Sequence, residues 1–77
     1  MVIDARGMAH PDHIQLFRKE FEGLCSVNED VDLLMDDKAD LLKKFEMFIR
    51  SCRISYTVEK EEGSLRVKIK APFCMCG

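Results

Sequence analysis

Two histidines near the N-terminus are candidate ligands for a metal ion. His10 and His13 flank Pro11, a residue that favours the start of a helix because it needs no N–H there. Side chains three positions apart share one face of a helix, so the two rings can lie together. Two ligands alone do not complete a zinc site, which takes about four. Three interpretations remain: the two histidines are a pair of metal ligands, one of them is a neutral imidazole held beside an anion site, or both are solvated surface residues.

Two cysteines close the sequence in the arrangement Cys74-Met75-Cys76-Gly77. Adjacent-but-one thiols can chelate a soft metal, or they can accept and pass on a sulfur atom. We expect residues 74–77 to form a flexible tail, since Pro72 ends the last predicted strand. Exposed thiols are the reactive ones. Cys74 and Cys76 are therefore the candidate sulfur acceptors of this chain.

A tail that folds back would carry these thiols to the histidines. The mixed metal site would then consist of His10, His13, Cys74 and Cys76, a ligand set that suits zinc or copper. Without such folding, no cofactor is expected. The other cysteines, Cys25 and Cys52, follow predicted helices beside apolar residues, and we expect them to be small core residues.

The composition is that of one small globular domain. The chain has 77 residues, 47% of them hydrophobic, and a net charge of −2. No apolar run approaches the roughly 18 residues of a membrane span, and the N-terminus has no basic region typical of a signal peptide. We therefore expect a cytoplasmic protein with reduced thiols. Nucleic acid is an unlikely partner despite Arg66, Lys68 and Lys70, because acidic residues lie close by in sequence.

Apolar periodicity predicts two helices and four strands. Helical spacing recurs over residues 11–24 and 38–51, with charged residues on the opposite faces. Short apolar runs at 2–3 and 31–35 predict two strands. Strict alternation over 54–58 and 65–71 predicts two more, joined by a hairpin turn at Glu61-Glu62-Gly63. The order of elements is βαβαββ.

Strict alternation of apolar and polar residues means that one face of the sheet is buried and the other is exposed to solvent. Both amphipathic helices must then cover the buried face. We predict an α+β fold, a two-layer α/β sandwich with a four-stranded mixed sheet, formed by residues 1–73 as a single domain. The predicted core comprises Ile3, Ile14, Phe17, Phe21, Leu24, Val31, Leu33, Leu41, Phe45, Phe48, Ile49, Tyr56, Val58, Val67 and Ile69.

The segment after the first predicted strand carries a recognisable motif. Asp4, Gly7 and Pro11 match the pattern Asp-x-x-Gly-x-x-Cys-Pro-x-Pro in identity and spacing, with His10 in the place of the cysteine and His13 in the place of the second proline. This motif and the βαβαββ order resemble the TusA/SirA family of small sulfur carriers. The resemblance implies a structural role for Asp4, Gly7 and Pro11. It also implies that His10 begins or caps the first helix, where the family holds its persulfide on a cysteine.

Three functions follow from these observations. The resemblance implies a sulfur-relay or sulfur-transfer-associated protein that acts through contact with partner proteins of a sulfur-transfer pathway. The histidines and the cysteine tail imply a small metal-binding protein. Loss of the motif cysteine implies a passive interaction module that keeps the docking surface. No complete catalytic constellation is present in the sequence, so a carrier is expected rather than an enzyme.

Overall fold

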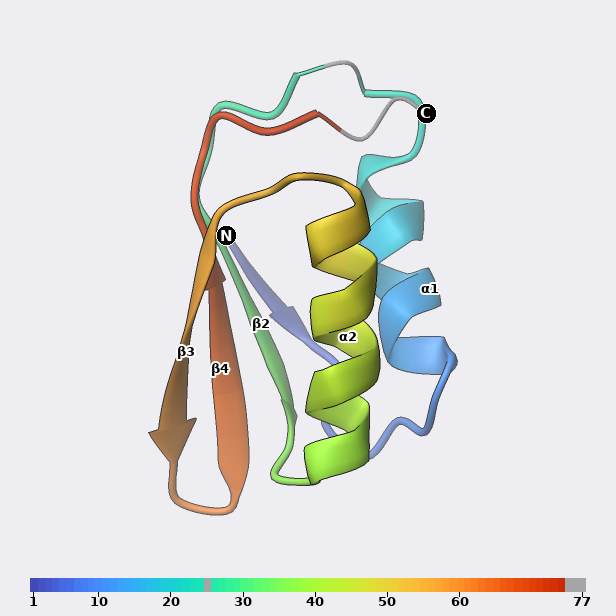
Figure 1. The fold of residues 1–77 in the computed structure, drawn as a ribbon, viewed down its shortest axis with the longest axis vertical. Helices are drawn as coiled ribbons and strands as arrows, with labels where there is room; N and C mark the ends of the chain where they lie inside the picture. The colour runs from blue at the N-terminus through green and yellow to red at the C-terminus, as the bar shows by residue number, and fades with distance from the viewer. Residues whose placement is uncertain (25, 75–77) are drawn as a thin grey trace.

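The computed structural model describes residues 1–24 and 26–74. The described residues form the predicted succession of four strands and two helices, shown in Figure 1. Their bounds are β1 (Val2–Asp4), α1 (Asp12–Phe21), β2 (Val31–Asp36), α2 (Ala39–Ser51), β3 (Tyr56–Glu61) and β4 (Ser64–Ile69).

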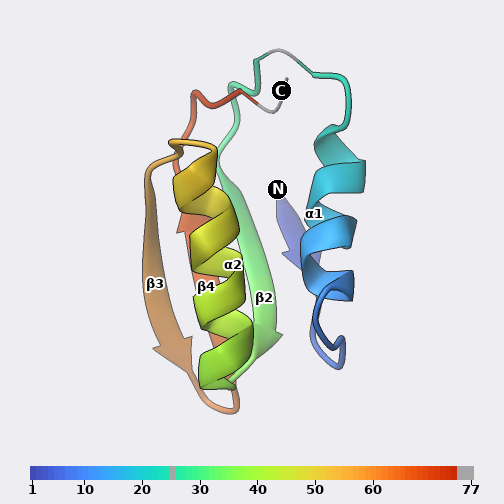
Figure 2. The same ribbon diagram turned by 45° about the vertical axis from the view of Figure 1, so that its right-hand side comes forward.

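The four described strands form one mixed sheet in the order β1-β2-β4-β3. β1 runs parallel to β2, while β4 is antiparallel to both β2 and β3. Figures 1 and 2 show both helices on the same face of this sheet, with α1 beside β1 and β2 and α2 in front of β4. The predicted two-layer α+β fold is therefore confirmed.

The alternation of β4 explains why the layers form. Val67 lies opposite Leu33 of β2 on one side and Val58 of β3 on the other, so apolar side chains line up across the sheet under the helices. Arg66 and Lys68 alternate with the buried residues of β4 and project from the other face. Phe17 and Phe45, one from each helix, are fully buried above the sheet with their ring centroids 5.5 Å apart.

Most of the predicted core is buried, three of its members are half-buried and two are exposed. Ile14, Phe48 and Tyr56 are half-buried against the core. Leu24 is 46% exposed because α1 ends at Phe21, three residues earlier than predicted, and Gly23 then turns the chain with a φ of 81°. Val58 is 36% exposed because β3 is an edge strand with a neighbour on one side alone. The buried members of the predicted set are Ile3, Phe17, Phe21, Val31, Leu33, Leu41, Phe45, Ile49, Val67 and Ile69.

The core also contains residues outside the predicted set. Phe73 pairs with Val27 in an isolated antiparallel bridge, in which the N–H of Val27 donates to the Phe73 carbonyl at 2.7 Å. The Phe73 ring packs against those of Phe17 and Phe21. Two connecting segments thus close the core beyond the ends of the strands. The additional buried residues are Ala5, His13, Val27, Leu34, Met35, Ile54, Ser64, Leu65 and Phe73.

Both helices begin one residue later than predicted. Pro11 is the N-cap of α1 and Lys38 that of α2, so each precedes the first helical residue. At the other end of α2, Arg53 has a φ of 58°. The N–H of Arg53 donates to the Arg50 carbonyl, and that of Ile54 donates to the Ile49 carbonyl. This pair of bonds is a Schellman motif, which stops the helix and sends the chain towards β3.

Candidate functional site at the start of the first helix

The loop between β1 and α1 is held in place by acidic side chains. The Asp4 carboxylate accepts hydrogen bonds from the backbone N–H of Arg6 at 3.1 Å and from its guanidinium at 2.9 and 2.8 Å. Hydrogen bonding from the guanidinium and then from the Arg6 backbone lowers the pKa of Asp4 to about 2. The N–H of Gly7, whose φ is 83°, donates to Asp36 at 3.1 Å, which ties the loop to the end of β2. These hydrogen bonds join the loop to the end of β1 and to the end of β2.

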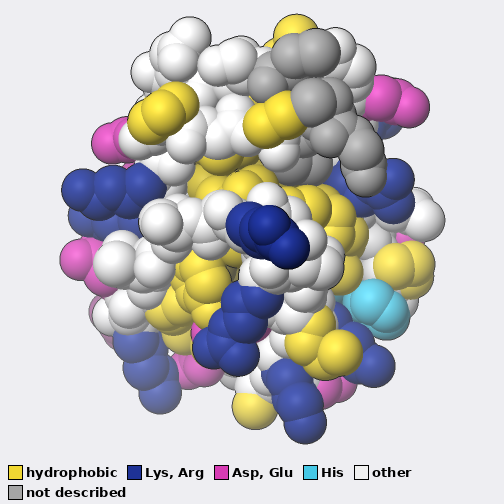
Figure 3. All heavy atoms as spheres, turned by 45° about the horizontal axis from the view of Figure 1, so that its top comes forward, with side chains coloured by type: hydrophobic (Ala, Val, Ile, Leu, Met, Phe, Trp, Pro, Cys, Tyr) yellow, Lys and Arg dark blue, Asp and Glu magenta, His cyan; other side chains and the backbone are white. Residues whose placement is uncertain are grey.

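His10 lies at the exposed beginning of α1, directly before the N-cap residue Pro11. The N–H of Asp12 donates to the Ala9 carbonyl at 2.8 Å, and the Pro11 carbonyl accepts the first bond of the helix ladder from Gln15 at 3.0 Å. The side chain of His10 is exposed, whereas that of His13 is buried. Figure 3 shows histidine atoms at the surface of the face that it draws. His10 therefore lies one residue before the N-cap: it stands beside the helix start, but it neither begins nor caps α1 as predicted, because Pro11 takes the N-cap position.

His13, in contrast, is a core residue. Its side chain is fully buried, and its Nε2 lies 3.1 Å from the Leu41 carbonyl oxygen in the first turn of α2. A carbonyl accepts and never donates, so the proton sits on Nε2 and Nδ1 carries a lone pair. Nδ1 has no hydrogen-bond partner among the described residues. Burial lowers the pKa of His13, and the Leu41 carbonyl opposes this shift less strongly. The interpretation of two solvated histidines is therefore wrong for His13.

The two histidine rings do lie together, as their spacing predicts. Their centroids are 5.7 Å apart with the rings at 69°, an edge-on contact, and the other side of His13 faces the Phe45 ring at 6.0 Å. The buried ring of His13 joins the start of α1 to α2 through Leu41 and Phe45. His13 thereby supports the exposed ring of His10 from beneath.

Cys74, the tail cysteine that the structure describes, does not join the histidines. Cys74 is exposed and follows Phe73, whose ring packs against Phe21 in the last turn of α1. His10 precedes the other end of that helix, and Figure 1 shows these two parts at opposite ends of the molecule. Within residues 1–24 and 26–74, no group of three His, Cys, Asp or Glu side chains is placed to hold a metal ion. The predicted site of His10, His13 and Cys74 is therefore not assembled, and its fourth member, Cys76, lies outside the described residues.

The structure describes two of the four cysteines, Cys52 and Cys74. Cys52, the C-cap residue of α2, is half-buried and packs against the core, as predicted. Cys25 lies outside the described residues. The predicted flexible tail at 74–77 is described only at Cys74, so its last three residues also fall outside the described part of the chain.

The charged face of the sheet is internally neutralised. Arg66 contacts the carboxylates of both Asp32, at 2.8 Å, and Glu61, at 3.2 Å. Lys68 pairs with Glu59 at 3.1 Å. Cations that are already paired with neighbouring carboxylates leave little net field for a polyanion. Arg66 and Lys68 are thus engaged by carboxylates of the sheet itself.

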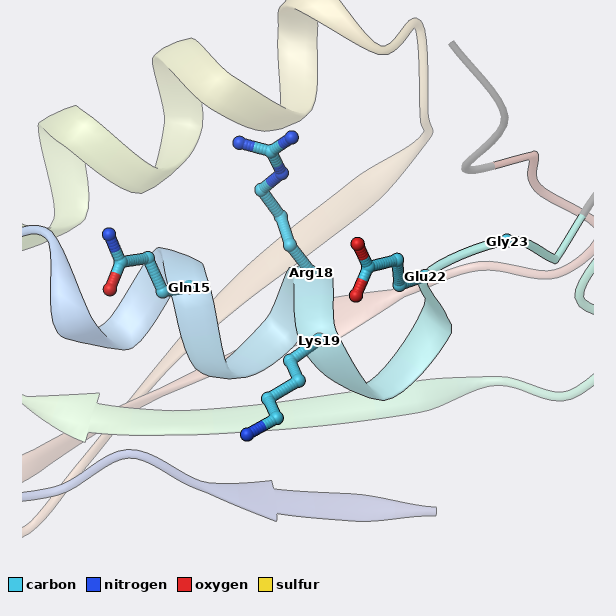
Figure 4. Close-up of a pocket in the computed structure, with 5 residues that line it drawn as sticks. All are labelled: Gln15, Arg18, Lys19, Glu22 and Gly23. Atoms are coloured by element: carbon cyan, nitrogen blue, oxygen red, sulfur yellow. The ribbon is translucent and has the colours of Figure 1, made fainter.

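The exposed side of α1 carries a shallow depression of about 330 Å³. Its lining residues, drawn in Figure 4, are Gln15, Arg18, Lys19, Glu22 and Gly23. In Figure 4 the side chains of Arg18 and Lys19 point in opposite directions, so the polar groups do not converge on one ligand position. A ligand site normally combines an apolar hollow with convergent polar groups. The depression is therefore a surface feature of the helix rather than a formed site.

Sequence reasoning missed a second polar cluster between α2 and β3. The Tyr56 hydroxyl donates to Glu46 at 2.6 Å and accepts from the Arg50 guanidinium at 3.1 Å. The hydrogen bond to Glu46 is the main cause that raises the pKa of Tyr56. The i, i+4 spacing of Glu46 and Arg50 is visible in the sequence, but their shared tyrosine comes from a different element.

The resemblance to the TusA/SirA family is supported by the motif and the order of elements, and comparison with known proteins adds nothing to it. No family model, curated protein or solved structure matches the chain. In the described part of the chain, neither helix is long and apolar enough to cross a membrane.

Proposed function

We propose that this chain is a TusA/SirA-like cytoplasmic protein that takes part in sulfur transfer by docking onto partner proteins. Its docking site is the β1–α1 loop with His10, and no sulfur is held at the motif position, since imidazole cannot carry sulfane sulfur. The observation that carries the proposal is the ordered loop itself. It is held by Asp4 and by Asp36, and it presents His10 where the motif calls for the reactive cysteine.

The physical support for docking is preorganisation. A loop that is fixed before binding loses less conformational entropy in a complex than a mobile loop does. His10 stands exposed on this loop, and the buried His13 ring fixes the helix start behind it. An exposed side chain on a rigid support is suited to recognition by another protein.

A cysteine restored at the motif position tests the proposal. The variant His10→Cys is made in a background with Ser at positions 25, 52, 74 and 76, and is offered a polysulfide donor. The matched control, Glu22→Cys in the same background, places an exposed thiol at the C-cap of the same helix. The positive helix start stabilises a thiolate or persulfide anion and the negative end disfavours it. We expect His10→Cys to gain one reducible sulfur faster than Glu22→Cys.

Intact-protein mass spectrometry with and without reductant reads the result. Equal uptake by the two variants, or none by His10→Cys, contradicts a sulfur-transfer origin of this site. In the chain with its natural cysteines, the proposal places any exchangeable sulfur on Cys74 and Cys76. Deletion of residues 74–77 should then abolish the adduct.

A further inference from the structure

β3 leaves one edge of the sheet open. It is the last strand in the order β1-β2-β4-β3, and no described segment lies along its outer side in Figure 1 or Figure 2. The strand runs for six residues, Tyr56–Glu61, in continuous register with β4. It contains no proline and no bulge, two of the devices that commonly block such an edge.

The backbone register shows which groups are free to pair. The N–H of Lys70 donates to the Ser55 carbonyl at 3.0 Å, which makes these opposed residues a hydrogen-bonded pair. Bonded pairs alternate along an antiparallel ladder, so Thr57, Glu59 and Glu61 bond to β4. The N–H and C=O groups of the intervening residues, Tyr56, Val58 and Lys60, therefore point out of the sheet edge.

The charges of β3 are already compensated within the domain. Glu59 pairs with Lys68 at 3.1 Å and Glu61 with Arg66 at 3.2 Å. Lys60 reaches Asp37 at 3.2 Å. An approaching strand therefore meets no unpaired charge on this edge, and it meets the partly exposed side chain of Val58 at the middle.

We propose that two copies of this chain pair antiparallel through β3, with Val58 of each copy at the two-fold axis. The two four-stranded sheets then join into one continuous sheet of eight strands. In this register the outward-pointing residues face each other: Val58 meets Val58, and Tyr56 meets Lys60 of the second copy. Each such pair exchanges two backbone hydrogen bonds. The interface is independent of the sulfur-transfer proposal and lies away from the β1–α1 loop.

The side chains select this register over its neighbours. On the helix face, Lys60 stands opposite the second copy's Tyr56, whose hydroxyl already contacts the carboxylate of Glu46. On the other face, Glu59 stands opposite Thr57. A register centred on Glu59 would oppose two carboxylates, which is unfavourable. A register centred on Thr57 would pair fewer residues of the strand.

The opposite edge of the sheet, formed by β1, has fewer backbone groups available for pairing with another strand. β1 has three residues, Val2–Asp4, and Asp4 at its end is engaged by Arg6. Such a short edge supplies few backbone groups for a second copy. The choice of β3 as the self-pairing edge follows from this difference in length.

A charge swap at the two-fold axis tests the proposal. Val58→Lys and Val58→Glu each bring two like charges face to face, and we expect each to raise the dimer dissociation constant by about tenfold or more. An equimolar mixture of the two variants should restore the dimer, because opposite charges then meet. The matched control is Thr57→Lys, which places the same new charge opposite Glu59 of the second copy and should leave the dimer intact or strengthen it.

Sedimentation velocity over a concentration series measures the wild type, the three variants and the mixture, and circular dichroism checks that each variant is folded. Wild-type protein that stays monomeric at about 1 mM, where even weak contacts are populated, overturns the proposal. Val58→Lys that dimerises like the wild type overturns it too, since the contact then lies elsewhere. A charge-swap mixture that remains monomeric is a third contradicting result.

Discussion

His13 is the residue for which the sequence-based interpretation as a solvated histidine differs most from the structure, where it is buried. Its Nε2 binds the Leu41 carbonyl, while its buried Nδ1 has no partner among the described residues. A buried polar atom without a partner lowers stability, and a charged imidazole at this place would lower it further. The neutral ring is retained as a bridge between the beginnings of the two helices. We infer that His13 makes the domain sensitive to acid.

The pH dependence of stability tests this role. Burial lowers the pKa of His13 in the folded protein, and neighbouring His10 acts in the same direction while Asp12 opposes it. The unfolded chain therefore binds a proton that the folded protein does not, starting at the ordinary value of about 6.5. Stability should fall as pH drops through this value, by up to about 1.4 kcal/mol for each pH unit from this one group.

The variant His13→Leu removes the titrating ring and keeps an apolar side chain at the same place. Urea unfolding of both proteins between pH 5 and pH 8, a range that brackets the ordinary histidine pKa, gives the comparison. We expect the difference in unfolding free energy between wild type and variant to shift in favour of the variant as the pH falls. Parallel pH profiles would contradict a neutral, buried His13.

At the scale of the elements, Arg53, just beyond the end of α2, lowers the stability of the domain. Arg53 adopts a φ of 58° in the Schellman motif, a left-handed conformation that glycine adopts freely and that residues with a Cβ adopt only with strain. Arg53→Gly should therefore raise the free energy of unfolding by about 1 kcal/mol. Arg53→Ala is the control, because alanine keeps the Cβ and the strain. Thermal unfolding of both variants measures the effect, and equal gains would show that loss of the arginine side chain is the cause.

The lengths of the two edge strands determine which edge of the sheet can pair with a second copy. β1 and β3 both border the sheet, yet β3 is twice as long and carries its charges in internal ion pairs. The β1–α1 loop, in turn, lies near the end of β2 and is fixed by Asp36 of that strand. The two proposed contact surfaces thus belong to different elements and can be altered separately.

At the scale of the whole molecule, stability rests on one aromatic layer between helices and sheet. Phe45 is fully buried and contacts the rings of Phe17, Phe48 and His13. Phe45→Ala should lower the free energy of unfolding by about 3–5 kcal/mol, because a cavity remains where the ring was. Met47→Ala is the matched control on the same helix: its side chain is 60% exposed, so the change should stay within about 0.5 kcal/mol. Urea denaturation distinguishes the two, and a similar loss for both would contradict the assigned helix face.

The sequence by itself determined the order of the elements and the two-layer fold. Period-two alternation in Leu65, Val67 and Ile69, and helical spacing in Leu41, Phe45 and Ile49, each assign one face to the core. Such local periodicity needs no knowledge of distant residues. The Asp4, Gly7 and Pro11 spacing likewise placed His10 beside the start of a helix.

The tertiary structure alone decided which neighbours come together across the chain. The burial of His13 depends on Leu41, 28 residues away, and the burial of Phe73 depends on Val27. The exposure of Val58 depends on the strand order, which leaves β3 without a second neighbour. The separation of Cys74 from the histidines follows from the length of α1 between them. Periodicity reports which way a side chain faces on its own element, whereas burial and site assembly depend on what the fold brings opposite to it.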